Sequence, residues 1–162
     1  MNNNMQQQTT INIQEKANLI WAIADKLVGV YKPHEYGNVI LPMCVIKRFE
    51  DTLAPTKQAV LDTNAKLDKD GIVVKKGFLE TAAGQQFYNL SPFTFQSLLN
   101  DPENIKENFE SYLNHFSENV IDIIHRMDFD RELQKMADNN VLYLVIKEFC
   151  TCLLYTSDAA DD

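Results

Sequence analysis

The sequence predicts an all-α fold, and three observations carry that prediction. Apolar residues recur at helical spacing through most of the 162-residue chain. Pairs of a capping residue and a proline mark several expected helix starts. The hydrophobic content of 45% is typical of one domain with a single core. We expect a mostly helical bundle in which only residues 72–88 leave room for a short β-hairpin. The expected organisation is a disordered lead-in at 1–10, a helical domain at 11–150 and a non-native tail at 151–162.

The first helix is expected to follow a polar lead-in. Residues 1–10 are rich in Asn and Gln, a composition that cannot bury enough surface to order itself. Asn12 can cap a helix, with Glu15 three residues on, and the helix should end near Tyr31, before Pro33. Its apolar residues are expected to form one stripe: Ile13, Ala17, Ile20, Trp21, Ala24, Leu27 and Val28.

The second helix is expected to be the core helix. Residues 33–53 open with a proline at the first helical position. Apolar side chains follow at helical spacing: Tyr36, Val39, Ile40, Met43, Ile46 and Phe49. Pro42 lacks a backbone donor, so it either kinks this helix or marks its true start. Pro55 is expected to start a shorter helix that runs to about Leu67.

Residues 68–90 are the least helical part of the sequence. Asp70, Gly71 and Gly77 bracket the β-prone run 72–76, so a small hairpin or an exposed loop would fit. Two pairs of a capping residue and a proline, at 91–92 and 101–102, then indicate helix starts.

The second of these pairs leads into a clean apolar face: Ile105, Phe109, Tyr112, Leu113 and Phe116. Ser117 is expected to start the next helix, and Asp128 or Asp130 to cap another. Asn139 and Asn140 should break the chain again. The last apolar stretch, 141–149, fits either a buried helix or a strand, and its charged residues Lys147 and Glu148 favour the helix.

No arrangement of residues indicates a catalytic, cofactor or metal site. The five glycines lie too far apart for a phosphate-binding loop, and the histidines (His34, His115 and His125) have no metal-ligand spacing. The acidic residues Asp122, Asp128, Asp130 and Glu132 follow helix ends, which favours solvated caps over an acid–base pair. The aromatic residues Trp21, Phe109, Tyr112 and Phe116 have aliphatic neighbours at helical spacing, which favours core over base stacking.

The net charge of −8 would discourage non-specific binding to nucleic acid. The basic residues gather in the first half of the chain, and four of them are candidate DNA contacts, the alternative being a solvated face: Lys75, Lys76, Lys47 and Arg48. We expect no membrane segment, since no apolar run approaches the ~20 residues that a span needs. The protein is expected to be cytoplasmic, with reduced cysteines.

The last eleven residues, 152–162, resemble a sequencing adapter translated as protein. Such a scar is excluded from fold reasoning. We therefore expect the natural protein to continue beyond about Thr151.

The remaining residues resemble a known family. A Trp-x-x-Ala-Asp-x-Leu pattern stands at residues 21–27, and a Glu-Tyr-x-x-x-Ile-Leu-Pro pattern follows at 35–42 with Lys47 and Arg48 after it. Further matching segments keep the same order: 87–95, Asn104 with Ile105, Tyr112, Phe116 with Ser117, and 128–130. Over about residues 15–150 the chain resembles the N-terminal helical domain of the methylation subunit of type I restriction-modification systems, an adenine-specific DNA methyltransferase.

The resemblance implies a supporting role for this part of the subunit. In the family a Rossmann-like domain follows, binds S-adenosylmethionine and methylates the N6 atom of adenine through an Asn-Pro-Pro-aromatic motif. This chain has no Asn-Pro dipeptide, so we expect it to hold no cofactor and to be inactive alone. Its expected partners are the specificity subunit, a second methylation subunit, the restriction subunit and, through them, DNA. The alternative is a free-standing helical interaction module.

Overall fold

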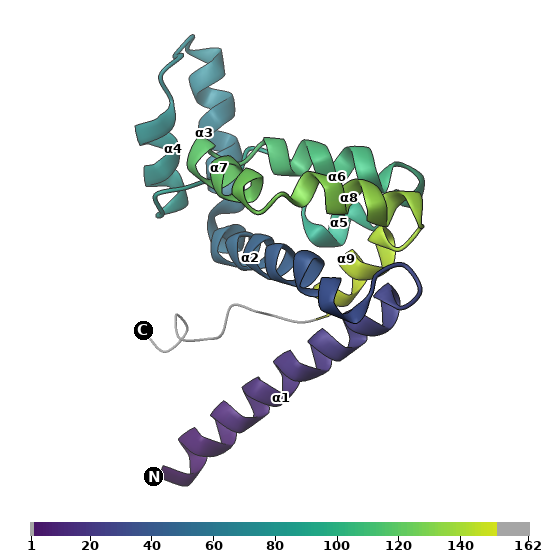
Figure 1. Cartoon of the computed structure of the whole chain (residues 1–162). Helices are drawn as coiled ribbons and strands as arrows, with labels where there is room; N and C mark the ends of the chain where they lie inside the picture. Colours follow the sequence, from purple (N-terminus) through teal and green to yellow (C-terminus); the bar gives the residue numbers. More distant parts are fainter. Residues whose placement is uncertain (1, 152–162) are drawn as a thin grey trace.

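The computed structural model describes residues 2–151, and within them every regular element is a helix (Figure 1). The predicted all-α fold is therefore confirmed. The α-helices are α1 (Asn2–Leu27), α2 (Gly37–Leu53), α3 (Lys57–Lys69), α4 (Lys76–Ala83), α5 (Phe95–Leu98), α6 (Ile105–Asn114), α7 (Glu118–Arg126), α8 (Phe129–Asp138) and α9 (Leu142–Cys150). Three short 3-10 turns join them: Pro33–Glu35, Ala54–Thr56 and Pro102–Asn104.

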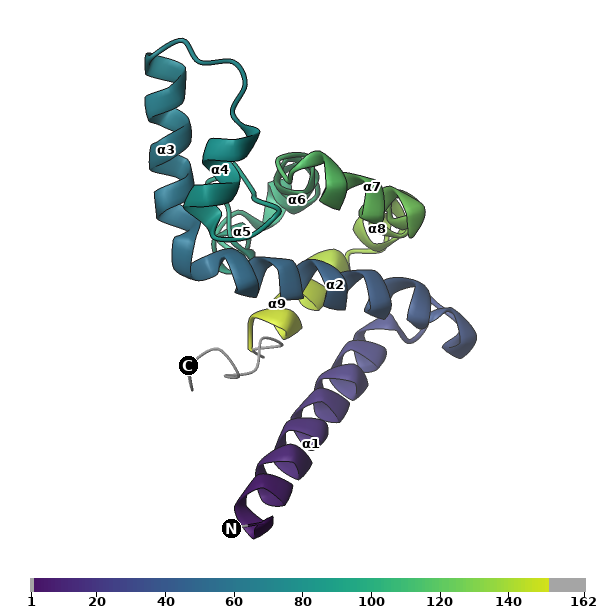
Figure 2. The same cartoon turned by 90° about the vertical axis from the view of Figure 1, so that its left-hand side faces the viewer.

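The helices form a central body with two arms. Helix α2 runs through the body and packs against α8, while α9 contacts α1, α5, α6 and α8. Helices α3 and α4 pack against each other and extend from one end of α2, and α1 projects from its other end (Figures 1 and 2). Helix α1 packs on the body mainly at α9.

The centre of the body is aromatic. Phe95, Phe109 and Tyr112 contact one another, with ring centroids 5.8 to 6.0 Å apart. Phe129 from α8 and Phe116, two residues after the end of α6, extend the cluster. All five side chains are buried, so the interpretation of Phe109, Tyr112 and Phe116 as core is confirmed. Such rings contribute more than their buried area because their edges and faces attract one another.

Helix α1 differs from its prediction in both length and orientation. It begins at Asn2 rather than near Asn12, so residues 2–10, expected to be a disordered lead-in, form its first turns. Gln and Met are good helix formers, and adding a turn to an existing helix costs little.

The orientation of α1 makes the core interpretation of Trp21 wrong. The buried side chains of this helix are Leu19, Ile23 and Leu27. Of the predicted stripe only Leu27 is among them, and Trp21 is 71% exposed. The helix has two apolar faces, and their spacing alone does not tell which one meets α9.

Of the two structures that fit this segment, a β-hairpin and an exposed loop, the hairpin near 72–88 does not form. Residues 72–75 form an exposed loop, the other reading of this segment, and α4 follows at Lys76–Ala83. Phe78, Leu79 and Ala82 are spaced for a helix, and the preceding apolar run is too short to pair with a second strand. The helix ends at Gly84, whose φ of 68° is left-handed and favours glycine.

Most of the other helices begin and end near the capping residues and prolines that predicted them. Ser117 and Asp128 occupy the N-cap positions of α7 and α8, and residues 142–150 form a helix rather than a strand. Pro42 lies inside α2, which starts five residues earlier, at Gly37. The pair at 91–92 does not start a helix: α5 begins after Thr94, whose hydroxyl accepts a hydrogen bond from the Ser97 amide at 3.0 Å.

Residues 152–162, the predicted non-native tail, lie outside the described part of the chain. Among the described helices, none is both long enough and apolar enough to cross a bilayer.

Candidate functional site

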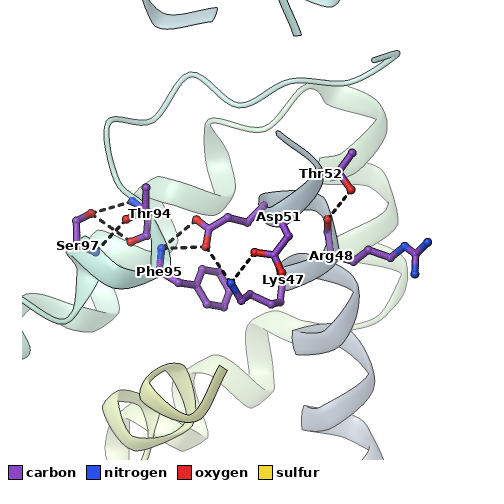
Figure 3. A network of polar contacts seen from close by, with 8 residues as sticks. Lys47, Arg48, Asp51, Thr52, Thr94, Phe95 and Ser97 are labelled. Atoms are coloured by element: carbon purple, nitrogen blue, oxygen red, sulfur yellow. Dashed lines mark hydrogen bonds and ion pairs between the residues drawn. The ribbon is translucent and has the colours of Figure 1, made fainter. Parts of the chain in front are cut away.

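A cluster of charged side chains lies inside the body, on one face of α2. Lys47, Glu50 and Asp51 share this face because they are three and four residues apart on a helix. The Lys47 ammonium donates a hydrogen bond to the Asp51 carboxylate at 2.6 Å and lies 3.9 Å from Glu50 (Figure 3). The Lys47 and Asp51 side chains are 8% and 7% exposed. A buried charge is tolerated only when it is paired in this way.

Glu50 connects this cluster to α5. The backbone N–H of Phe95 donates to both carboxylate oxygens of Glu50, at 2.9 and 3.1 Å (Figure 3). The carboxylate therefore lies at the N-terminus of α5, where the backbone amides have no partner within the helix. Thr94 and Ser97 complete the same turn, because the backbone N–H of each donates to the hydroxyl of the other.

Burial shifts the acid–base behaviour of this cluster. It raises the pKa of Glu50, although the charge of Lys47 and the hydrogen bonds from Phe95 and Tyr112 oppose the shift. It also raises the pKa of the Tyr112 hydroxyl, with Glu50 adding to the effect. Burial lowers the pKa of Lys57, and the charge of Glu50 offsets part of this shift. Its ammonium lies 5.8 Å from the centroid of the Tyr112 ring.

A cavity of about 140 Å³ adjoins the cluster. Its apolar wall includes Leu53, Val60 and Phe95, and its lining contains no histidine. Cys150 also lines it, and burial raises the pKa of this thiol, which favours the unreactive protonated form. Lys47 pairs with Asp51 and Glu50, and the Lys57 ammonium lies over the Tyr112 ring. We therefore interpret the cluster as the junction that fixes α5 on α2.

The structure separates the four candidate DNA contacts. Lys47 belongs to the buried cluster, so its ammonium is unsuited to a phosphate contact. Arg48 is exposed on α2. The Lys75 ammonium donates a hydrogen bond to the Asn64 side chain at 3.0 Å and pairs with the Asp68 carboxylate. The Lys76 side chain is 80% exposed, and its ammonium lies 3.9 Å from the Glu80 carboxylate. Only Arg48 and the Lys75–Lys76 pair stay as predicted contacts, and they lie on different elements.

The comparisons with known proteins yield one match. A family model described as the HsdM N-terminal domain matches residues 16–149. The chain belongs to this family. The match confirms the resemblance to the N-terminal domain of a type I restriction-modification methylation subunit. No curated protein and no solved structure matches the chain.

Elsewhere in this HsdM N-terminal domain, the histidines and acidic residues do not converge. Among residues 2–151 no group of three His, Cys, Asp or Glu side chains is placed to hold a metal ion. The imidazole of His125 lies 3.4 Å from Asp130, and both side chains are more than half exposed. The solvated-cap interpretation is wrong for Glu132, which is buried; its backbone carbonyl accepts a hydrogen bond from Tyr31 at 3.3 Å.

Sequence reasoning missed the central cluster of this HsdM N-terminal domain. Glu50 and Asp51 are not among the residues predicted to be functional, and Lys47 is predicted to be a surface DNA contact. The available signal was the spacing of Lys47, Glu50 and Asp51, which puts three charges on one side of a helix already predicted to be core. Their contacts with Phe95 and Tyr112 depend on segments more than forty residues away in the sequence.

Proposed function

We propose that this chain is the assembly and DNA-enclosing domain of a type I methylation subunit that works in the cytoplasm. The observation that carries the proposal is the family match over residues 16–149. In this proposal a separate domain of the subunit binds S-adenosylmethionine and methylates adenine at N6. The helical domain supplies surfaces for the specificity, restriction and second methylation subunits.

The exposed side chains support a docking role. Large apolar residues stay in water on α1 and around the α3–α4 loop, among them Trp21 at 71%, Val73 at 88% and Val74 at 81% exposed. Apolar groups that gather on a surface commonly mark interaction sites. In the proposal, partner subunits cover them.

Contact with DNA is assigned to the exposed cations. Arg48 and Lys76 are free to reach a phosphate, while Lys75 must first leave Asn64 and Asp68. Phosphate contacts position a protein on DNA without reading its sequence. The proposed division of labour gives base recognition to the specificity subunit.

The deciding experiment is co-elution of the whole chain with the specificity subunit encoded beside its gene. We expect a complex, and we expect it to bind duplex DNA more weakly when Arg48 and Lys76 are both changed to Ala. Each lost phosphate contact should reduce the salt dependence of binding by about one unit of slope. Arg126→Ala with Lys147→Ala, both at exposed positions, is the charge-matched control.

Two outcomes would count against the proposal. Failure to bind the specificity subunit, with capture of an unrelated partner, would favour a free-standing interaction module. Methyl transfer to adenine by the purified chain with S-adenosylmethionine would contradict the assignment of catalysis to a separate domain.

A further inference from the structure

One face of α1 is apolar and uncovered by the rest of the described chain. Its large side chains are well exposed, with Val28 standing one residue past the end of the helix: Ile13 at 63%, Ile20 at 46%, Trp21 at 71% and Val28 at 65%. Ala17 and Ala24 lie between them on the same side, since residues three, four and seven apart share a helix face. We call these six residues the outer stripe. It adjoins the inner face (Leu19, Ile23 and Leu27), which packs on the body.

The outer stripe is symmetric about its midpoint. From Ile13 to Val28 the steps between successive members are 4, 3, 1, 3 and 4 residues, which read the same from either end. If two α1 helices lie antiparallel with this midpoint on a two-fold axis, Ile13 meets Val28, Ala17 meets Ala24 and Ile20 meets Trp21. A two-fold interface needs this self-complementarity, because each contact occurs twice.

The charges on α1 also permit the approach of a second copy. The chain carries a net charge of −8, so two copies repel each other. Helix α1 itself has two acidic and two basic residues, Glu15, Lys16, Asp25 and Lys26, and these lie outside the outer stripe. Its charges therefore cancel.

Ile13 lies on the half of α1 that projects from the body. The rest of the outer stripe lies on the half whose inner face packs on the body, where Ile20, Trp21 and Val28 stay exposed. Both views show α1 projecting from the body, with its N-terminal half away from the other helices (Figures 1 and 2). Ala17 and Ala24 carry small side chains, which let a second helix approach to the short end of the usual 8–10 Å interaxial range.

We propose that two copies of this chain associate through the outer stripes of antiparallel α1 helices. This deepens the proposed assembly role, on which it rests for its biological setting, by naming the surface that a second methylation subunit contacts. A single helix pair lies at the small end of protein interfaces, so the expected dissociation constant is on the order of micromolar.

Sedimentation of the whole chain tests the association. The wild-type chain should shift from monomer to dimer between about 1 µM and about 100 µM, and the emission of Trp21, the chain's one tryptophan, should shift to the blue as water leaves it. Trp21→Glu should stay monomeric over this range. Asn18→Glu adds the same charge to an exposed position beside the stripe and should dimerise like wild type. Circular dichroism of each variant checks that the helices are intact.

Crosslinking tests the antiparallel direction. A chain with Ala17→Cys should form a disulfide with a separate chain carrying Ala24→Cys, and neither variant should crosslink with itself through the new cysteine. Tryptic mass spectrometry identifies the joined peptides, with the wild-type chain and its native cysteines as the control. An Ala17→Cys homodimer would indicate parallel helices and overturn the proposed geometry.

A chain that is monomeric throughout, or a Trp21→Glu variant that dimerises like wild type, would overturn the inference. If the monomeric chain still bound the specificity subunit, the proposed function would stand, and the outer stripe would be assigned to a different subunit.

Discussion

The aromatic centre of the body and the outer stripe of α1 have the same sequence pattern but opposite environments. Phe109, Tyr112 and Phe116 recur at helical spacing and are buried, whereas Ile13, Ile20 and Trp21 recur at helical spacing and face water. Both patterns indicate a helix with one apolar face. The difference shows that a pattern does not say whether the chain itself covers that face or leaves it for another molecule.

The largest effect that separates the two regions is expected from truncating one aromatic ring in each. Phe109 has no exposed surface, so Phe109→Ala removes its contacts and leaves a cavity, at a cost of about 4 kcal/mol. Trp21→Ala should change the stability of the monomer by less than about 0.5 kcal/mol, since Trp21 packs little within one copy. Urea unfolding at a low, monomeric concentration measures both.

Equal losses in these two variants would contradict the comparison. A large loss for Trp21→Ala at low concentration would mean that the outer stripe supports the fold of a single chain.

A second contrast concerns two lysines that the sequence grouped together. Lys47→Met keeps the volume of a buried side chain but leaves Asp51 and Glu50 without its charge, so we expect a loss of about 3 kcal/mol in the free energy of unfolding. Lys76→Met, at a side chain that is 80% exposed, should cost less than about 0.5 kcal/mol. Thermal unfolding followed by circular dichroism compares the pair. Similar melting temperatures for the two variants would show that Lys47 is not buried.

The smallest expected effect is a pH dependence centred on Glu50. Burial raises the pKa of this carboxyl above its ordinary 4.5, so the folded chain holds the proton more tightly than the unfolded chain. The stability contributed by this group is present below pH 4.5 and is lost as the pH rises through the raised pKa. Glu50→Gln cannot ionise, so its stability relative to wild type should rise between pH 4.5 and neutral pH.

Unfolding curves at several pH values test this trend. Glu103→Gln, at an exposed position, controls for the loss of one carboxylate from the chain. A constant difference between Glu50→Gln and wild type across the range would contradict the assigned direction of the pKa shift.

The sequence predicts a helix boundary or a buried helix face correctly where the deciding residues are close together in the chain. Pro33 and Pro102 precede helices, Ser117 and Asp128 stand at N-cap positions, and the face from Ile105 to Phe116 is buried as its spacing predicts. These features depend on residues within a few positions of one another, so a single sequence contains the necessary information.

The errors at Lys47, at Trp21 and in segment 72–88 concern contacts between distant segments. Lys47 reads as a surface cation until Phe95 and α9 are placed around it, and Trp21 reads as core until α9 selects the other face of α1. The hairpin expected near Val73 failed because the β-prone run had no partner strand. In each case the local pattern permitted two outcomes, and a segment remote in sequence decided between them.

The carboxylate of Glu50 has a consequence for the order in which the chain folds. Helix α5 has four residues, too few to persist in water by itself, because the first turn of a helix costs more entropy than its one hydrogen bond returns. The acceptor at its N-terminus arrives from a position 45 residues earlier, after a long loop has closed. We therefore expect helix α5 to form after its segment docks on α2 and not before. This part of the fold should then form late in folding.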